Sequence, residues 1–204
     1  MARPLGRYSM TAIALHWLMA ALIGVNLWLG LGLALATGGV AGLPARPGPF
    51  AWHAGIGLTL LALAFARIGW RLANPPPPEA PGRAHWQKSA ANALHLAFYA
   101  WMIGMPLSGW LLATTDPRIP GVHLFHLGVS SGLPLPRMPL PAHISVARRR
   151  ALASSAASIH RDLAYVALAL IGLHMASVLK QQMFDPNPVL ARMSPFAKKR
   201  AAKP

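Results

Sequence analysis

Apolar residues gather in four long runs, and polar segments rich in glycine and proline separate them. The runs extend over about residues 9–36, 50–72, 89–114 and 158–180. Each has roughly 20 residues or more, which is the length that an α-helix needs to cross the hydrocarbon core of a bilayer. The pattern therefore predicts an all-α membrane protein in which four transmembrane helices form a four-helix bundle within a single domain.

The segments between the runs are unequal in length and composition. The first connection is a glycine- and proline-rich turn, and the second contains the proline run Pro75–Pro78, which excludes a helix there. The longest connection, residues 115–157, is predicted to be a loop, and residues 181–204 to be a basic, polar tail. Inside the third run, Pro106 predicts a kink, because its ring clashes with the preceding helical turn.

The first run leaves one alternative open, a cleaved signal peptide. Residues 34–36, Ala-Leu-Ala, resemble a cleavage site. The apolar run is, however, roughly twice as long as the usual signal core of about 7–15 residues. It also carries His16 and Asn26. We therefore expect the run to be retained as a helix.

Composition excludes several classes of function. The chain is 54% hydrophobic and 11% charged, with only four acidic residues, and its mean hydropathy is +0.42. No pair of carboxylates is available for hydrolytic acid–base catalysis. The absence of cysteine excludes disulfides, thiolate-bound iron–sulfur clusters and covalent c-type haem attachment.

The net charge of +15 points to a membrane rather than to nucleic acid. The basic residues lie between and after the apolar runs, as they do in membrane proteins. The N-terminus, the connection after the second run and the tail together carry more Lys and Arg than the other connections. The positive-inside rule therefore predicts that both termini are cytoplasmic and that residues 115–157 are exterior.

Histidines within the runs are the main candidates for chemistry. His160 and His174 lie fourteen residues apart in the fourth run, which separates them by about 21 Å along a helix and about 40° around it. The predicted orientation places His53 level with His160 on the exterior side, and His16 level with His174 on the cytoplasmic side. Two imidazoles from different helices can occupy both axial positions of a haem iron. The pattern thus predicts two haems.

Three further residues have open interpretations. His95, on the third run, lies at the cytoplasmic level, where it is an alternative ligand, a group that supports a ligand, a quinone contact or simply an interfacial histidine. Arg67 and Arg71 end the second run. They either pair with the propionates of the cytoplasmic haem or extend to the membrane surface.

Several stretches of sequence together resemble one family, the bacterial cytochromes b561. They are RYSMTAIALHWLMA around His16, ARIGWRL at the end of the His53 helix, AANALHLAFYAWMIGMPLSGW around His95, IHRDLAYVALALIGLHMASVLK, and FDPNPVLARMSP near the end. The resemblance covers nearly the whole chain in order. It implies a di-haem protein with b-type haem, electron transfer to a quinone, and a multi-pass location in the bacterial inner membrane.

The resemblance also implies a set of ligands. The family's four haem-ligand positions fall on His16, His53, His160 and His174. The chain departs from the family pattern at Gln181-Gln182, where a histidine pair is common, and in the exterior loop.

One branch of the family consists of superoxide oxidases, which pass the electron of superoxide to ubiquinone. The resemblance therefore favours an oxidoreductase with superoxide as donor and ubiquinone as acceptor. Exterior basic residues would attract such an anion. The candidates for steering it are Arg46, Arg148, Arg149, Arg150 and Arg161.

Two other classes of function stay open. A cytochrome b subunit would link a separate dehydrogenase or a periplasmic cytochrome to the quinone pool, and the exterior loop would then dock that partner. A membrane scaffold or transporter would have no redox role and no haem spectrum.

Overall fold

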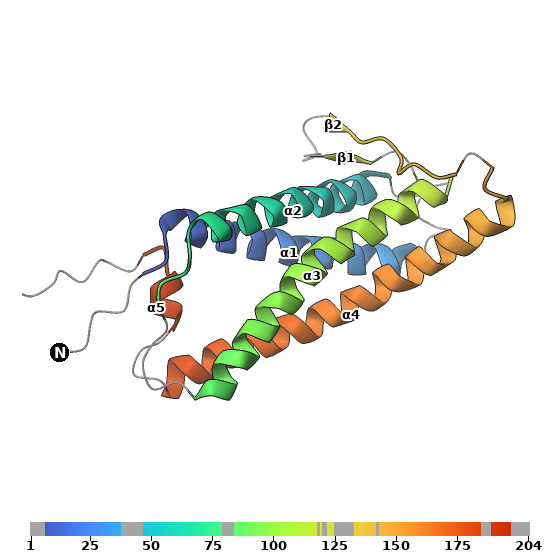
Figure 1. The fold of residues 1–204 in the computed structure, drawn as a ribbon. Coiled ribbons are helices and arrows are strands. Elements are labelled where there is room, and N and C mark those ends of the chain that lie inside the picture. Colours follow the sequence, from blue (N-terminus) through green and yellow to red (C-terminus); the bar gives the residue numbers. More distant parts are fainter. Residues whose placement is uncertain are drawn as a thin grey trace, which may run out of the picture.

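Four long helices dominate the computed structural model, which describes residues 7–37, 47–78, 84–117, 119, 122–124, 133–141, 143–184 and 189–196. They are α1 (Met10–Thr37), α2 (Pro47–Ala73), α3 (His85–Thr115) and α4 (Val146–Phe184) (Figure 1). All four are long and apolar enough to cross a membrane. The prediction of an all-α protein with four transmembrane helices is confirmed.

Helices that follow one another in the chain pack side by side. α1 packs on α2, α2 on α3, and α3 on α4, so that the bundle consists of two hairpins joined through α2 and α3 (Figure 1). At one end of the bundle lies the short helix α5 (Val189–Met193), and at the other lie the strands β1 (His123–Leu124) and β2 (Leu133–Pro134). We refer to these as the α5 end and the β end.

The β end carries a minimal antiparallel ladder, in which His123 pairs with Pro134 and Leu124 with Leu133. The chain after β2 is fastened to the end of α3 by Arg137. Its guanidinium donates to the carbonyl oxygens of Ala113 and Thr114, each at 3.2 Å. Carbonyl oxygens at a helix C-terminus have no N–H donor within the helix, and Arg137 donates the missing hydrogen bonds. This arginine therefore holds the described part of the long connection against the bundle.

Helix α4 begins twelve residues before its predicted start and takes in the last part of the segment predicted to be a loop. Ser145 caps it, because the Ser145 Oγ accepts the backbone N–H of Arg148 at 3.2 Å. The residues that follow are rich in alanine and contain neither glycine nor proline, which favours a helix. Ala156 is buried against Leu112 and Ala113 of α3. With 39 residues, α4 is about 58 Å long, much longer than a hydrocarbon core of about 30 Å.

The tail predicted over residues 181–204 is folded where the structure describes it. α4 continues to Phe184, and α5 then lies against the start of α1. The Trp17 Nε1 donates to the Met193 carbonyl at 2.8 Å, and Arg7 donates to the carbonyl of Ser194. The Arg192 guanidinium donates to the Pro78 carbonyl at 2.9 Å. α5 is therefore part of the fold.

An apolar layer divides the interior midway along the bundle. It contains Met19 of α1, Leu60 and Ala64 of α2, Trp101 of α3 and Ala167 of α4. Ala64 and Ala167 are completely buried, as small residues are where membrane helices approach closely. The Trp101 Nε1 donates to the Leu163 carbonyl of α4 at 2.8 Å, so its polar atom is satisfied. We call this set the middle layer.

Candidate functional site

The two histidines predicted to pair at the exterior level do face each other at the β end. The ring centroids of His53 and His160 are 6.0 Å apart, and the ring planes make an angle of 87°. His53 belongs to α2 and His160 to α4, two helices that are not among the closely packed pairs. The rings therefore meet across the interior of the bundle, as ligands on either side of a flat cofactor must.

Both rings are held in the same way, by a main-chain carbonyl of a neighbouring helix. The His53 Nδ1 lies 3.1 Å from the Asn26 carbonyl oxygen of α1, and the His160 Nδ1 lies 3.1 Å from the Met105 carbonyl oxygen of α3. A carbonyl oxygen can only accept, so each Nδ1 carries the hydrogen. In the neutral imidazole the Nε2 then keeps its lone pair, which is the state that binds a metal.

A glycine makes each of these contacts possible. Gly30 lies four residues after Asn26, and Gly109 lies four residues after Met105. A Cβ at Gly30 would lie 2.8 Å from the His53 Cε1, and a Cβ at Gly109 would lie 2.9 Å from the His160 Cε1. Only glycine lets the ring come this close. We call each carbonyl, together with the glycine four residues later, a carbonyl–glycine seat.

The seats reveal a repeat that the sequence analysis did not find. On α1, Gly30 follows His16 by fourteen residues, and on α3, Gly109 follows His95 by fourteen residues. In each case the seat receives the histidine of the next helix. The α1–α2 and α3–α4 hairpins thus share one arrangement of histidine, glycine and seated histidine. It involves too few residues to appear as sequence similarity. The signal was a histidine followed by a glycine fourteen residues later.

At the α5 end, His174 has two imidazole neighbours instead of one. Its ring centroid is 6.3 Å from that of His16 and 6.3 Å from that of His95. The His95 Nδ1 is 2.6 Å from the Ala91 carbonyl of its own helix. His16 lies on α1, which is not closely packed against α4, and the two helices of the β-end pair are likewise not closely packed. His95 lies on α3, which packs directly on α4. This geometry favours His16 as the partner of His174.

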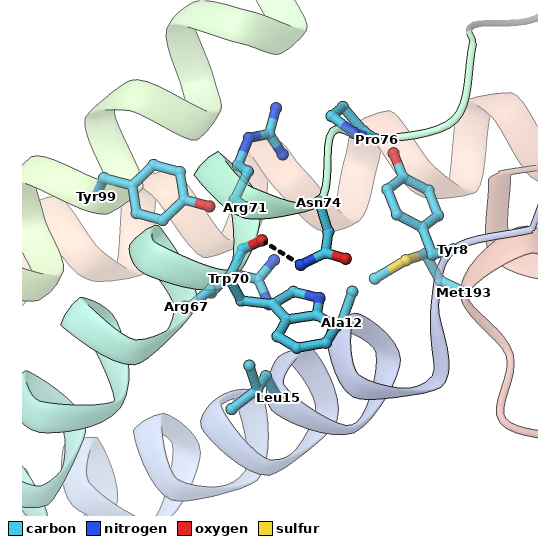
Figure 2. A pocket seen from close by; sticks show the side chains of 10 residues that line it. All are labelled: Tyr8, Ala12, Leu15, Arg67, Trp70, Arg71, Asn74, Pro76, Tyr99 and Met193. Atoms are coloured by element: carbon cyan, nitrogen blue, oxygen red, sulfur yellow. Dashed lines mark hydrogen bonds between the residues drawn. The ribbon is translucent and has the colours of Figure 1, made fainter.

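Arg67 and Arg71 line an open cavity at the α5 end (Figure 2). Arg67 is near enough to interact electrostatically with both His16 and His95. Within the described part of the chain, neither guanidinium is paired with a carboxylate. The enclosed part of the cavity is small, about 40 Å³, and the rest opens to solvent. Its walls are formed by Tyr8, Ala12, Leu15, Arg67, Trp70, Arg71, Asn74, Pro76, Tyr99 and Met193.

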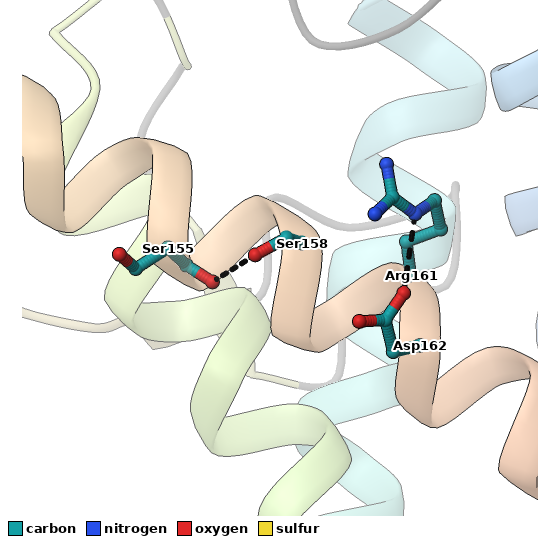
Figure 3. A network of polar contacts seen from close by, with 4 residues as sticks. All are labelled: Ser155, Ser158, Arg161 and Asp162. Carbon is teal, nitrogen blue, oxygen red and sulfur yellow. Dashed lines mark hydrogen bonds and ion pairs between the residues drawn. The ribbon is translucent and has the colours of Figure 1, made fainter.

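Of the arginines expected to steer an anion, Arg46 lies outside the residues that the structure describes, and the other four lie on α4 toward the β end. Arg161 pairs with Asp162, with 3.3 Å between its Nε and the carboxylate Oδ1, and their side chains are 65% and 66% exposed (Figure 3). Such a pair is weak, and its charges offset each other. Residues 148–150 are the third to fifth residues of α4 and point in different directions around it, since consecutive residues are about 100° apart. The helix dipole adds positive potential there.

The donor sets fit haem iron better than a bare metal ion. Centroid separations of 6.0 and 6.3 Å suit two imidazoles on opposite sides of one metal atom, because each metal–nitrogen bond takes up about 2 Å. Within the described ranges, no group of three or more His, Cys, Asp or Glu side chains could hold a metal ion. Two axial imidazoles suffice for haem, whose porphyrin supplies the remaining ligands.

Comparison with known proteins decides the family. The family model for prokaryotic cytochrome b561 matches residues 7–196. The chain belongs to the prokaryotic cytochrome b561 family. It is similar to cytochrome b561 homolog 2 of Escherichia coli (strain K12), with 27% identity over 191 residues that cover 92% of this chain and 90% of that protein.

Membership of the cytochrome b561 family confirms the resemblance seen in the sequence. A cytochrome b561 binds b-type haem and transfers electrons. Four apolar helices make this one a multi-pass bacterial membrane protein.

The carbonyl–glycine seats give a direct test of the β-end pair. We expect Gly30→Ala to displace the His53 ring, because the new Cβ would lie 2.8 Å from Cε1, and, with His53 as a haem ligand, to lower the haem content. Gly32→Ala is the matched control on the same helix, since nothing lies within 4 Å of its Cβ position. Haem per purified chain, measured by absorbance, is the readout. Equal haem content in the two variants would contradict the seat.

Proposed function

We propose that this cytochrome b561 holds two b-type haems, one between His53 and His160 and the other between His16 and His174. The observation that carries the proposal is the β-end pair, in which both Nδ1 atoms are bound to carbonyls and both Nε2 atoms are left for a metal. Haem, when bound, supplies reversible one-electron chemistry at its iron.

The protein's own residues have separate tasks in this scheme. The carbonyls of Asn26 and Met105 fix the rotation and the tautomer of the two β-end ligands. The middle layer keeps water out of the space between the two sites. Arg67, which is near His16, is placed to neutralise haem propionates at the α5 end, and Arg71 supports it.

We propose that the α5 end is cytoplasmic and that the β end faces the exterior of the bacterial inner membrane. The excess of Lys and Arg in the N-terminus, in the connection between α2 and α3 and in the tail supports this orientation. It places the Arg148–Arg150 turn outside and the cavity of Arg67 and Arg71 inside. Electrons would then enter at the β end and leave at the α5 end.

The proposed reaction is the oxidation of superoxide coupled to the reduction of ubiquinone. Two superoxide anions each give up one electron and become dioxygen, and one ubiquinone takes up two electrons and two protons to form ubiquinol. The arginines at the positive end of α4 support superoxide as the donor, because they attract a small anion.

The cavity at the α5 end supports a quinone as the acceptor. Trp70 and Tyr99 offer aromatic surface and Leu15 apolar surface, while the two arginines offer hydrogen-bond donors to a ring carbonyl (Figure 2). Asn74 lies in the same wall, where its Nδ2 donates to the Trp70 carbonyl at 3.1 Å. A mostly apolar cavity with a few polar groups is typical of a binding site for a small organic ligand.

A second candidate function is favoured by the shape of the β end. The first turns of α4 and the β1–β2 ladder form a folded protein surface there, held to α3 by Arg137. A periplasmic cytochrome or the redox subunit of a dehydrogenase would dock on such a surface. Co-purification of a second redox protein would favour this function over the oxidation of superoxide.

The number of haems and their separate loss test the proposed ligands. We expect two non-covalent haems per chain in the pyridine haemochrome assay, all released by acid–acetone. His53→Ala and His160→Ala should each remove the β-end haem, and His16→Ala and His174→Ala the other one, because about 21 Å of helix separates the two levels. A wild-type content of one haem would contradict the four-ligand scheme.

His95→Ala distinguishes the two possible partners of His174. We expect this variant to keep both haems, whereas His16→Ala should keep one, because His16 alone reaches His174 between helices that are not closely packed. Haem content and the ferric spectrum are the measurements. A variant His95→Ala that loses one haem while His16→Ala keeps two would reverse the assignment.

The dependence of haem reduction on salt tests superoxide as the donor. We expect replacement of Arg148, Arg149 and Arg150 by Gln to slow reduction by pulsed superoxide, most strongly at low salt, since the Debye length falls from about 30 Å at 0.01 M to about 10 Å at 0.1 M. Arg161→Gln should slow it at all salt concentrations, because Arg161 adjoins His160 and a charge this close to the haem is screened least.

Lys180→Gln is the control for that experiment, because it removes one positive charge near the opposite end of α4. Haem reduction should be followed by stopped flow in detergent, with reoxidation by a ubiquinone as the second phase. A rate of reduction that is indifferent both to salt and to the arginines would remove the steering argument and favour a protein donor.

A further inference from the structure

The two carbonyl–glycine seats share one geometry but differ in a hydroxyl group beside the ring. In both, the imidazole Nδ1 lies 3.1 Å from the carbonyl oxygen. At His160, however, a second polar atom is present, the Ser108 Oγ, at 2.9 Å from the same Nδ1. Ser108 directly precedes Gly109, and the residue that directly precedes Gly30 is Leu29. The ring of His53 therefore lacks the hydroxyl that the ring of His160 has.

The direction of the hydrogen bonds follows from the neighbours of the hydroxyl. The Ser108 Oγ donates its hydrogen to the Met105 carbonyl oxygen at 2.7 Å. Its lone pairs are then available to the His160 Nδ1–H, which is shared between two acceptors. Ser108 is only 8% exposed, so water does not compete for this contact. The low dielectric of the site strengthens both bonds.

We propose that Ser108 is a positioning residue that makes His160 a stronger electron donor to the β-end iron and so lowers the reduction potential of that haem. The proposal rests on the haem ligation proposed above. An acceptor on the far nitrogen of a ligating imidazole raises the basicity of the ligand. A more basic axial ligand stabilises ferric over ferrous iron, and hydrogen bonding of this kind is one of the means by which proteins set haem potentials.

Ordinary helix packing does not account for the contact. Buried hydroxyls in helices often bond only to a carbonyl of the preceding turn, as Thr59 does with the Gly55 carbonyl at 2.8 Å. Ser108 makes such a bond and also reaches a ring on another helix. Pro106 is not the cause of the seat either, because α1 forms the same 3.1 Å contact without a proline at the matching position, Leu27.

The test is the reduction potential of each haem in the full-length holoprotein, measured by potentiometry with visible absorption. We expect Ser108→Ala to keep both haems, because the Met105 carbonyl still holds the ring, and to raise the potential of one of them. Loss of one buried hydrogen bond should shift the equilibrium between oxidised and reduced iron by up to about tenfold, which is about 59 mV for one electron. The other haem should be unchanged.

Matched variants separate this role from a structural one. Ser108→Thr keeps the hydroxyl and should restore the wild-type potential. Thr59→Ala removes a buried hydroxyl of another helix that bonds only within its own helix, and it should leave both potentials unchanged. Leu29→Ser places a hydroxyl at the matching position on α1, beside His53, and should lower the potential of the same haem. In a His16→Ala background only the β-end haem is present, which assigns the shift.

The outcomes are distinct. Ser108→Ala with two haems and unchanged potentials would overturn the proposal. Loss of the β-end haem from Ser108→Ala would also overturn it, because the hydroxyl would then be needed to hold the ring rather than to tune it. An equal shift in Thr59→Ala would show a general effect of hydroxyl loss and would likewise refute a specific role. Wild-type protein without haem would overturn the proposed ligation itself.

Discussion

The hydrogen bond from a histidine Nδ1 to a helix carbonyl is the interaction on which the β end depends. A helix carbonyl is normally shielded by the side chain on the next turn, and it becomes accessible to a second donor only where that side chain is absent. Gly30 and Gly109 provide this opening, and the Asn26 and Met105 carbonyls are each reached at 3.1 Å. The bond needs no side chain as acceptor. It fixes the tautomer of each histidine and leaves the lone pair of each Nε2 available to a metal. It also requires that the helices approach closely, so the packing of the hairpins and the orientation of the rings are set together.

The same geometry explains how the bundle keeps two redox levels apart. Each hairpin brings one histidine to the β end by resting it on the preceding helix, and α4 alone carries a histidine to both levels. Between the levels, Ala64 and Ala167 are fully buried and Trp101 spans from α3 to α4. Small residues allow the helix backbones to approach there, and the side chains between the two levels form a buried apolar cluster. Under the proposed function this layer has a purpose: electrons can pass through it, whereas superoxide and protons remain on their own sides.

Much of this arrangement followed from the sequence, and what did not has identifiable reasons. The four helices depend on hydrophobic runs, and the matched depths of His53 with His160 and of His16 with His174 depend on helical rise, which are both properties of local sequence; the assignment of these residues as ligands stays a prediction. Ser145 and the alanines after it favour an early start of α4. The prediction nevertheless assigned these residues to the loop, because the connection before them is long and rich in proline. The carbonyl–glycine seats could not be predicted from the sequence, because every residue has a main-chain carbonyl and nothing marks the one that accepts. The two glycines also lie in runs where glycine is common. The closeness of His95 to His174 depends on how α3 packs on α4, which no local pattern fixes.

The two ends differ in a way that matches what each would have to do. At the β end the ring pair is nearly perpendicular, each ring is bonded to a carbonyl, and one carries a further hydroxyl contact. A superoxide anion needs no pocket and undergoes no bond making with the protein, so a rigid site reached by long-range attraction is sufficient. At the α5 end, Arg67 and Arg71 line an open cavity that α5 helps to close through Met193. The imidazoles of His16 and His95 lie on two sides of His174 at the same end. Reduction of a quinone requires a place for a bulky ring and a supply of two protons, so groups that donate hydrogen bonds and an opening toward solvent belong at that end. Under the proposed function, this asymmetry between a fastened pair and a polar, open end would give the electrons a direction that the near-repeat of the hairpins would not provide by itself.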